Sequence, residues 1–256
     1  MFVIRLWHRK SDASKLTMTE MNRGSNLEAG PRQNRVTPAG KFEAVTARGA
    51  FLGNRGRLHD CTGALGVATY QHRAWVTCEL EWRGRHRTIN SPGSYTELFF
   101  ADEAVALSAG HRPCAECRRG AFNRFRDAWQ RALGLPRPPR AVEMDAELHR
   151  SRLDHNRQRT FTAQLGQLPA GTMIEAPGSV GLPALLWGGQ LHPWRHTGYA
   201  APIAADMGSQ VVVLTPRPTV AALLAGYSPA VELGRPTAAI SHRGRVSGLA
   251  DPHPCP

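Results

Sequence analysis

The sequence has no long apolar run and very little lysine. None of its apolar stretches approaches the roughly 20 residues that a membrane-spanning helix requires. The apolar stretch at the N-terminus is too short for a signal peptide and has no basic region before it. We therefore expect a protein without a membrane segment that is located in the cytoplasm.

The common sequence signatures of enzymes are also missing. The chain contains no glycine-rich phosphate loop, no Gly-x-Ser-x-Gly motif and no His-Glu-x-x-His motif. Their absence argues against the most easily recognised nucleotide-binding proteins, serine hydrolases and zinc proteases. Any function therefore has to be inferred from other residues.

Positive charge is abundant, and arginine supplies nearly all of it. The formal net charge is +12 at pH 7, and lysine occurs only at Lys10, Lys15 and Lys41. Clustered arginines suit bidentate contacts with phosphate and indicate nucleic acid, with DNA expected, as a partner. The alternative is a GC-rich coding bias, which replaces lysine with arginine without functional pressure.

Cysteine is scarce, but two of the five cysteines form a Cys-x-x-Cys pair between arginines, Cys114 and Cys117. Two thiolates on one tight turn make half of a tetrahedral zinc site. A redox pair would stand at a helix start after a strand, whereas this pair follows a predicted helix and a proline. The pattern therefore predicts a bound Zn²⁺ ion.

A closed zinc site needs two further ligands, and the sequence offers few. We predict Cys78 and His59, with Cys61 as the substitute. Cys78 lies in a segment of alternating polarity that is typical of a strand, whereas His59 follows a glycine-punctuated turn. The predicted metal ligands are therefore Cys114, Cys117, Cys78 and His59.

Secondary-structure signals predict an α+β fold. Strands are expected at 42–47 and 74–82, and helices at 101–109, 120–133 and 141–154. Asp102 is placed to cap the first of these helices and Gly110 to end it. Strands at 172–175, 184–187 and 210–215, a hairpin turn at Gly188-Gly189 and a helix at 219–225 follow.

These signals divide the chain into four segments. Residues 1–35 are predicted to be a disordered extension, and residues 36–155 a zinc-binding α+β domain. A small β-rich C-terminal domain is expected at 165–232. A disordered tail is expected at 233–256.

One segment of the chain reads Phe99-Phe100-x-x-Glu103-Ala104, followed by Ala109-Gly110-His111-Arg112-Pro113-Cys114-x-x-Cys117-Arg118. This pattern resembles the second half of the zinc-binding domain at the N-terminus of the Ada DNA-repair protein. It implies an Ada-like zinc module, in which Cys114 and Cys117 match one of the two cysteine pairs that hold zinc in that family. The other pair, a close Cys-x-x-x-Cys upstream, has no counterpart here. The longer pattern from Gly53 to Trp129 is similar to an uncharacterised group of bacterial proteins.

We therefore expect a zinc-dependent nucleic-acid-binding protein with a link to DNA repair or processing. Phosphate contacts are predicted for four arginines near the cysteine pair: Arg112, Arg118, Arg119 and Arg124. One alternative is a metal-dependent nuclease or hydrolase that uses His59, Asp60 or His149. Another is a protein-interaction module with a purely structural zinc ion.

Overall fold

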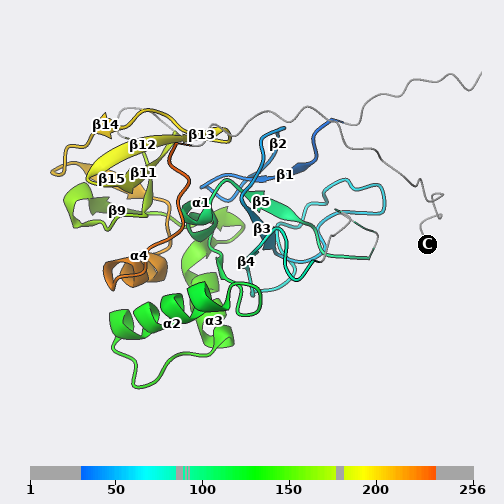
Figure 1. Cartoon of the computed structure of the whole chain (residues 1–256), viewed down its shortest axis with the longest axis horizontal. Coiled ribbons are helices and arrows are strands. Elements are labelled where there is room, and N and C mark those ends of the chain that lie inside the picture. Colours follow the sequence, from blue (N-terminus) through cyan, green and yellow to red (C-terminus); the bar gives the residue numbers. More distant parts are fainter. Residues whose placement is uncertain (1–29, 85–88, 90, 92, 177–181, 235–256) are drawn as a thin grey trace, which may run out of the picture. The chain divides into compact units, whose positions relative to one another are not determined.

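A computed structural model describes residues 30–84, 89, 91, 93–176 and 182–234 of the chain (Figure 1). From Pro31 onward, these residues belong to one compact unit. The predicted tail beyond 234 and most of the predicted extension, residues 1–29, lie outside the described residues. The prediction for 1–35 is wrong at its end, because β1 (Gln33–Val36) pairs there with two other strands.

The described residues form a mixed α+β structure, as predicted. A first sheet has the strand order β2-β1-β5-β3-β4-β6. After β1, its strands are β2 (Phe42–Ala44), β3 (Phe51–Asn54), β4 (Val76–Cys78), β5 (Leu98–Phe100) and β6 (Arg112–Pro113). This sheet is mixed, because β1 runs parallel to β5 and β4 runs parallel to β6, whereas β3 is antiparallel to both of its neighbours.

A second, antiparallel sheet is built from the C-terminal third of the chain. Its order is β13-β12-β11-β10-β15-β9, and β14 also pairs with β12. The strands are β9 (Phe161–Gln164), β10 (Met173–Glu175), β11 (Pro183–Trp187), β12 (Gln190–Arg195), β13 (Gly198–Tyr199), β14 (Ile203–Ala204) and β15 (Gln210–Val213). The predicted hairpin at Gly188-Gly189 joins β11 to β12, and both glycines have the positive φ that a two-residue turn of this kind requires.

Four α-helices occur in the described residues: α1 (Glu103–Ser108), α2 (Arg119–Leu133), α3 (Ala141–Arg152) and α4 (Arg217–Leu224). The last three share one apolar core, which includes Phe125, Trp129 and Leu148 (Figure 1). A short hairpin of β7 (Leu153–Asp154) and β8 (Arg157–Gln158) follows α3, and a 3₁₀ turn (Leu165–Gln167) follows β9. None of the described helices has both the length and the apolar character needed to cross a bilayer.

The two predicted domains share a hydrophobic core. One cluster of buried residues joins Leu98, Phe100 and the helix α1 to Met173 and Leu185 of the second sheet. The second sheet begins with β9 at Phe161, a few residues before the predicted boundary at 165, and the two sheets are packed together through this core.

The strand predicted for 74–82 is shorter than expected, and the side of it that is buried is the one predicted to be exposed. Only Val76–Cys78 is a strand, Thr77 is fully buried, and Leu80 is 49% exposed. The face of the sheet that carries Thr77 is the covered one, whereas the apolar residue Leu80 lies beyond the end of β4. The alternation of polar and apolar residues therefore identified the strand but assigned its buried face incorrectly.

Helix α1 begins as predicted at Asp102, whose Oδ1 accepts a hydrogen bond from the Val105 backbone N–H (2.9 Å). The other carboxylate oxygen accepts one from the Tyr199 hydroxyl (2.8 Å), which ties α1 to the second sheet. Burial raises the pKa of this carboxyl to about 6, although these hydrogen bonds oppose the change. The folded protein therefore retains a proton on Asp102 at pH values where an unfolded chain has lost it.

An Asp102→Asn variant should gain stability relative to the wild type as pH rises from about 4 to about 7. The amide oxygen of asparagine keeps the cap, and its NH2 group can donate to the Tyr199 hydroxyl oxygen in place of accepting from it, while the cost of ionising a buried acid is removed. The difference between the two free energies of unfolding should grow by roughly 3 kcal/mol for a pKa raised by about two units. Urea unfolding at several pH values measures it. In Asp206→Asn, whose carboxylate is exposed and has a lowered pKa, the difference should stay nearly constant over this range, because a lowered pKa changes stability mainly below about pH 4.

Candidate metal centre

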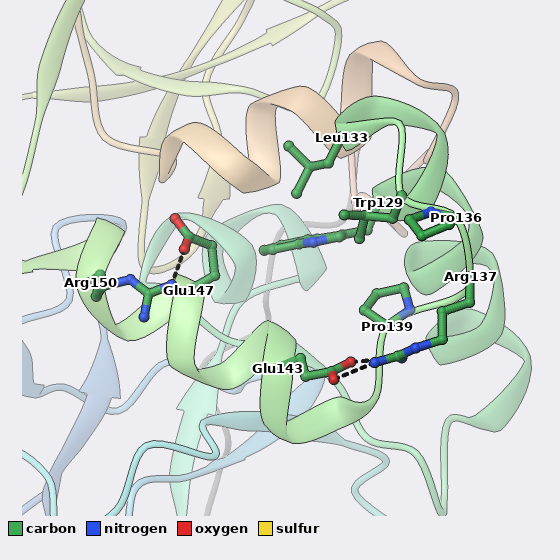
Figure 2. A pocket seen from close by; sticks show the side chains of 9 residues that line it. Trp129, Leu133, Pro136, Arg137, Pro139, Glu143, Glu147 and Arg150 are labelled. Atoms are coloured by element: carbon green, nitrogen blue, oxygen red, sulfur yellow. Dashed lines mark hydrogen bonds and ion pairs between the residues drawn. The ribbon is translucent and has the colours of Figure 1, made fainter.

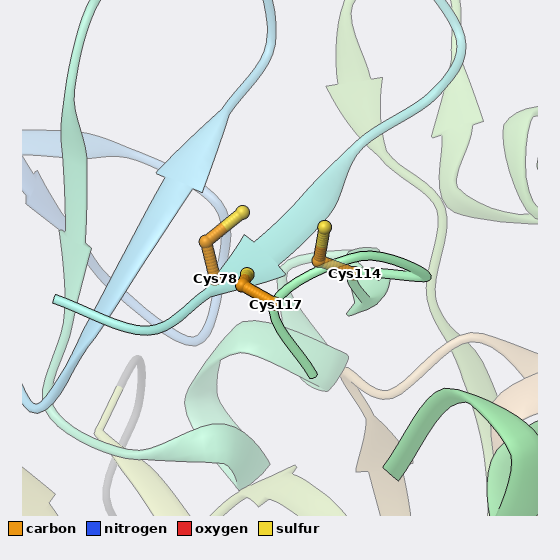
Figure 3. Close-up of side chains that lie close together, drawn as sticks. All are labelled: Cys78, Cys114 and Cys117. Atoms are coloured by element: carbon orange, nitrogen blue, oxygen red, sulfur yellow. The ribbon is translucent and has the colours of Figure 1, made fainter. Parts of the chain in front are cut away.

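Three cysteine side chains meet at one edge of the first sheet (Figure 3). The Sγ atoms of Cys78, Cys114 and Cys117 all lie within 4.8 Å of one another, and each side chain is partly buried. Cys78 is the last residue of β4, and the other two stand on the turn between β6 and α2. Three of the four predicted metal ligands are therefore brought together.

The pairing of β4 with β6 explains how distant residues meet here. Val76 lies opposite Arg112 and Thr77 opposite Pro113, and the Cys114 backbone N–H donates to the Thr77 carbonyl (2.9 Å). The next step of this parallel register places Cys78 beside Cys114. The sheet thus brings the Cys78 thiol to the Cys-x-x-Cys turn, although Cys78 and Cys114 are 36 residues apart in sequence.

Gly110 enables the sharp change of direction between α1 and β6. Its φ is +82°, and a Cβ atom there would lie 2.5 Å from Cδ of Arg152. Both facts favour glycine, since other residues are strained in this backbone conformation and the side chain has no room. The predicted helix stop is confirmed.

The three thiols change one another's pKa values. Hydrogen bonds from the Cys117 and Cys78 thiols lower the pKa of Cys114 far below its usual range, and the Glu116 backbone N–H also donates to its sulfur (3.4 Å). The same hydrogen bonds raise the pKa of Cys78, and the Cys114 thiolate raises that of Cys117. Without a cation, three sulfurs in this space thus favour a single thiolate, whereas a bound divalent ion stabilises all three as thiolates.

The donor set fits zinc. Tetrahedral zinc with Zn–S bonds of about 2.3 Å separates its sulfur ligands by about 3.8 Å, a spacing that three sulfurs within 4.8 Å of one another reach with small side-chain adjustments. Soft thiolates select zinc or copper(I) over magnesium or calcium. These residues can therefore supply three of four ligands to a soft metal ion.

His59 does not belong to this group. Its Nδ1 lies 2.7 Å from the hydroxyl oxygen of Thr96, and the residue is buried beyond the end of β3. The prediction of His59 as a ligand is therefore wrong for this arrangement of side chains, because the chain turns toward Thr96 after β3. Cys61 is not a member of the group either.

Two of the four arginines predicted to contact phosphate are buried in ion pairs. Arg112 makes two hydrogen bonds of 2.8 Å with the carboxylate of Asp145. Arg118 pairs with Glu79 (3.1 Å) and with Glu103 (2.9 Å). This burial contradicts direct phosphate contact by Arg112 and Arg118, since both already have carboxylate partners inside the protein.

The other two predicted arginines, Arg119 and Arg124, are exposed on α2. Arg119 is the first residue of this helix and stands two positions after Cys117. Within the described part of the chain, neither side chain forms an ion pair. Their contact with phosphate remains a prediction.

The residues considered for a nuclease centre do not gather. The His59 ring contacts Thr96, whereas His149 lies against the Tyr70 ring (5.1 Å between centroids) and the Arg152 guanidinium (3.1 Å). Within the described residues, the three cysteines are the one group of three or more histidine, cysteine or acidic side chains with metal-site spacing.

Two hollows lie away from the cysteines. One, of about 440 Å³, opens between α2 and α3 around Trp129 and is bordered by the Arg137–Glu143 and Arg150–Glu147 ion pairs (Figure 2). The other, of about 490 Å³, lies beside Trp75. The buried arginines Arg55 and Arg152 line it, and no motif in the sequence distinguishes them from the many other arginines.

Comparisons with protein-family models, with curated proteins and with solved structures give no match to this chain. The site therefore has to be interpreted from its own geometry.

Proposed function

We propose that this protein binds one Zn²⁺ ion through Cys78, Cys114 and Cys117 and binds nucleic acid, with DNA as the expected form, beside that centre. The observation that carries the proposal is the cluster of three thiols within 4.8 Å. Three protein ligands leave one of the four positions of zinc to water or to a residue outside those described. Metal analysis of the purified chain should then find one zinc ion per molecule.

The turn that carries Cys114 and Cys117 lies directly before helix α2 and its exposed arginines. Cys117 is followed at once by Arg118, the N-cap residue of α2, and by Arg119, its first residue. A metal ion on Cys114 and Cys117 would thus hold the start of α2 in place and with it the exposed Arg119. No side chain caps this helix, so its first N–H groups add favourable electrostatics for phosphate.

An Ada-like zinc module is part of this proposal. A short capped helix, a glycine with positive φ and a Cys-x-x-Cys turn follow one another in the order that the resemblance implies. Cys78 from β4 would take the place of one cysteine of the missing pair. A role in DNA repair or processing, in the cytoplasm, is part of the proposal.

Removing both exposed arginines of α2 should weaken binding to DNA. For Arg119→Gln/Arg124→Gln, the slope of log affinity against log salt concentration should become shallower by about two, because each phosphate contact releases about one counterion. Fluorescence anisotropy with a labelled duplex between about 50 and 200 mM salt measures this slope.

The matched control is Arg150→Gln, which removes one exposed arginine of α3. It should leave the slope unchanged. If the slope changes equally per removed charge in both variants, only the net charge of the protein matters for binding. If the zinc-loaded protein does not bind DNA at low salt, the nucleic-acid part of the proposal is contradicted. A parallel titration with duplex RNA tests the expected preference for DNA.

A further inference from the structure

The hollow beside Trp75 contains two buried guanidinium groups. The Cζ atoms of Arg55 and Arg152 lie 3.9 Å and 3.6 Å from the centroid of the Trp75 ring. Arg55 is 2% exposed and Arg152 is 1% exposed. Both side chains line the same hollow of about 490 Å³.

Neither guanidinium has a carboxylate partner among the described residues. Arg55 donates to Nε2 of His111 (3.3 Å) and to the carbonyls of Ala109 (3.3 Å) and Gly40 (3.4 Å). Its bonds are long and its acceptors are neutral, so they compensate poorly for the water that a buried cation has lost.

The hydrogen-bond acceptors around the Arg152 guanidinium are also neutral groups. It donates to the carbonyls of Gly110 (2.8 Å) and Arg73 (2.9 Å) and contacts Nδ1 of His149 (3.1 Å). Its buried Nε–H finds no hydrogen-bond partner in the described structure. One donor of a buried cation is therefore left without an acceptor.

The contrast with the other buried arginines is informative. Arg112 and Arg118 are buried to a similar extent, and each is paired with at least one carboxylate. Burial and the charge of Arg152 lower the pKa of Arg55, and burial lowers the pKa of Arg152 to about 9. Asp145 offsets part of the charge of Arg152, and an anion in the hollow would add the direct partner that both guanidiniums lack.

The rest of the hollow is suited to an anion. Lys41 and Arg157 are exposed at its walls, and Glu175 is its only acidic lining residue. Four neutral polar side chains also line it, Thr69, Asn156, Gln158 and Thr160, and the rest of the lining includes the apolar side chains of Phe42, Leu153 and Leu214. Its volume lies within the range of about 300–1,000 Å³ that is typical of small-molecule sites.

We propose that this hollow is a binding site for a small molecule that carries a phosphate group, held by Arg55 and Arg152 with Arg157 at the rim. Guanidinium groups form strong, charge-assisted hydrogen bonds with phosphate oxygens. The Trp75 side chain holds the two guanidiniums in place. This site is distinct from the cysteine centre and from the exposed arginines of α2.

Isothermal titration calorimetry with inorganic pyrophosphate, at constant ionic strength, tests the site on the 256-residue chain. We expect saturable binding of one pyrophosphate per chain. Arg157→Glu should weaken it at least about tenfold, because a charged hydrogen bond is replaced by repulsion. Arg159→Glu is the matched control: Arg159 is exposed two residues away, does not line the hollow, and should leave binding unchanged.

Arg152→Met separates a binding role from a structural one. A ligand-binding arginine should give a folded variant without detectable pyrophosphate binding. Wild-type affinity in this variant would overturn the proposal, as would no saturation of the wild type by about 10 mM pyrophosphate. If Arg152→Met does not fold, equal affinities of Arg157→Glu and Arg159→Glu would overturn it. Displacement of pyrophosphate by a single-stranded oligonucleotide would overturn the assignment to a small molecule.

Discussion

Replacing Cys114 with serine is expected to reduce the zinc content of the purified protein from about one ion per chain to nearly none. Serine offers a hard, protonated hydroxyl in place of a soft thiolate, and Cys114 is central to the coupled group of thiols. Binding of structural zinc contributes about 10–16 kcal/mol in small domains. Losing even part of this should lower the melting temperature by more than about 10 °C.

The measurement combines elemental analysis with thermal unfolding, and two variants make it specific. Cys61→Ser should retain the zinc ion, since Cys61 is not a member of the cysteine group. His59→Ala should also retain it, because the His59 ring contacts Thr96. Zinc loss in His59→Ala would show that the ligand set differs from the one proposed, and a wild-type protein without metal would refute a zinc centre.

Local signals in the sequence predicted the elements that frame this centre. The Asp102 cap and the Gly110 stop bracket α1, and the structure confirms both. Cys78 is predicted as a ligand because the sequence offers few cysteines and histidines near the pair. Each of these inferences uses only residues close together in sequence or a rare residue type, which is why they could be made.

The partners of the buried charges could not be predicted in this way. Arg112 meets Asp145 across 33 residues, and Arg118 meets Glu79 across 39. An arginine beside a cysteine pair has the same sequence appearance whether it faces solvent or a carboxylate. Only the tertiary structure, which brings Asp145 of α3 to Arg112 of β6, decides that Arg112 is internal, and nothing in the local sequence encodes that contact.

The same difficulty applies to Arg55 and Arg152. Both are arginines in an arginine-rich chain, and neither stands in a recognisable motif. Their distinguishing property is a buried charge without a direct ion pair in the described structure, which is a property of three-dimensional surroundings. A structure is therefore needed to distinguish buried arginines that pair with a carboxylate of the protein from buried arginines that could bind an anion.

The ion pair between Arg112 and Asp145 should carry the largest stability effect outside the cysteine centre. Asp145→Ala leaves Arg112, which is 4% exposed, without its carboxylate, and breaking a buried pair on one side costs about 3–5 kcal/mol. Urea unfolding should show this loss. The double variant Arg112→Met/Asp145→Ala should be more stable than Asp145→Ala alone, because no unpaired charge remains.

A matched change elsewhere on α3 separates this effect from a general weakening of the helix. Glu147→Ala removes the carboxylate that pairs with Arg150 at the surface, and it should change stability little because water replaces the lost partner. Equal losses for Asp145→Ala and Glu147→Ala would contradict the assigned role. Asp145→Ala should still bind one zinc ion, because Asp145 pairs with Arg112 and is not a member of the cysteine group. Zinc binding together with the loss of stability would show that the ion pair joins β6 to α3 without holding the metal.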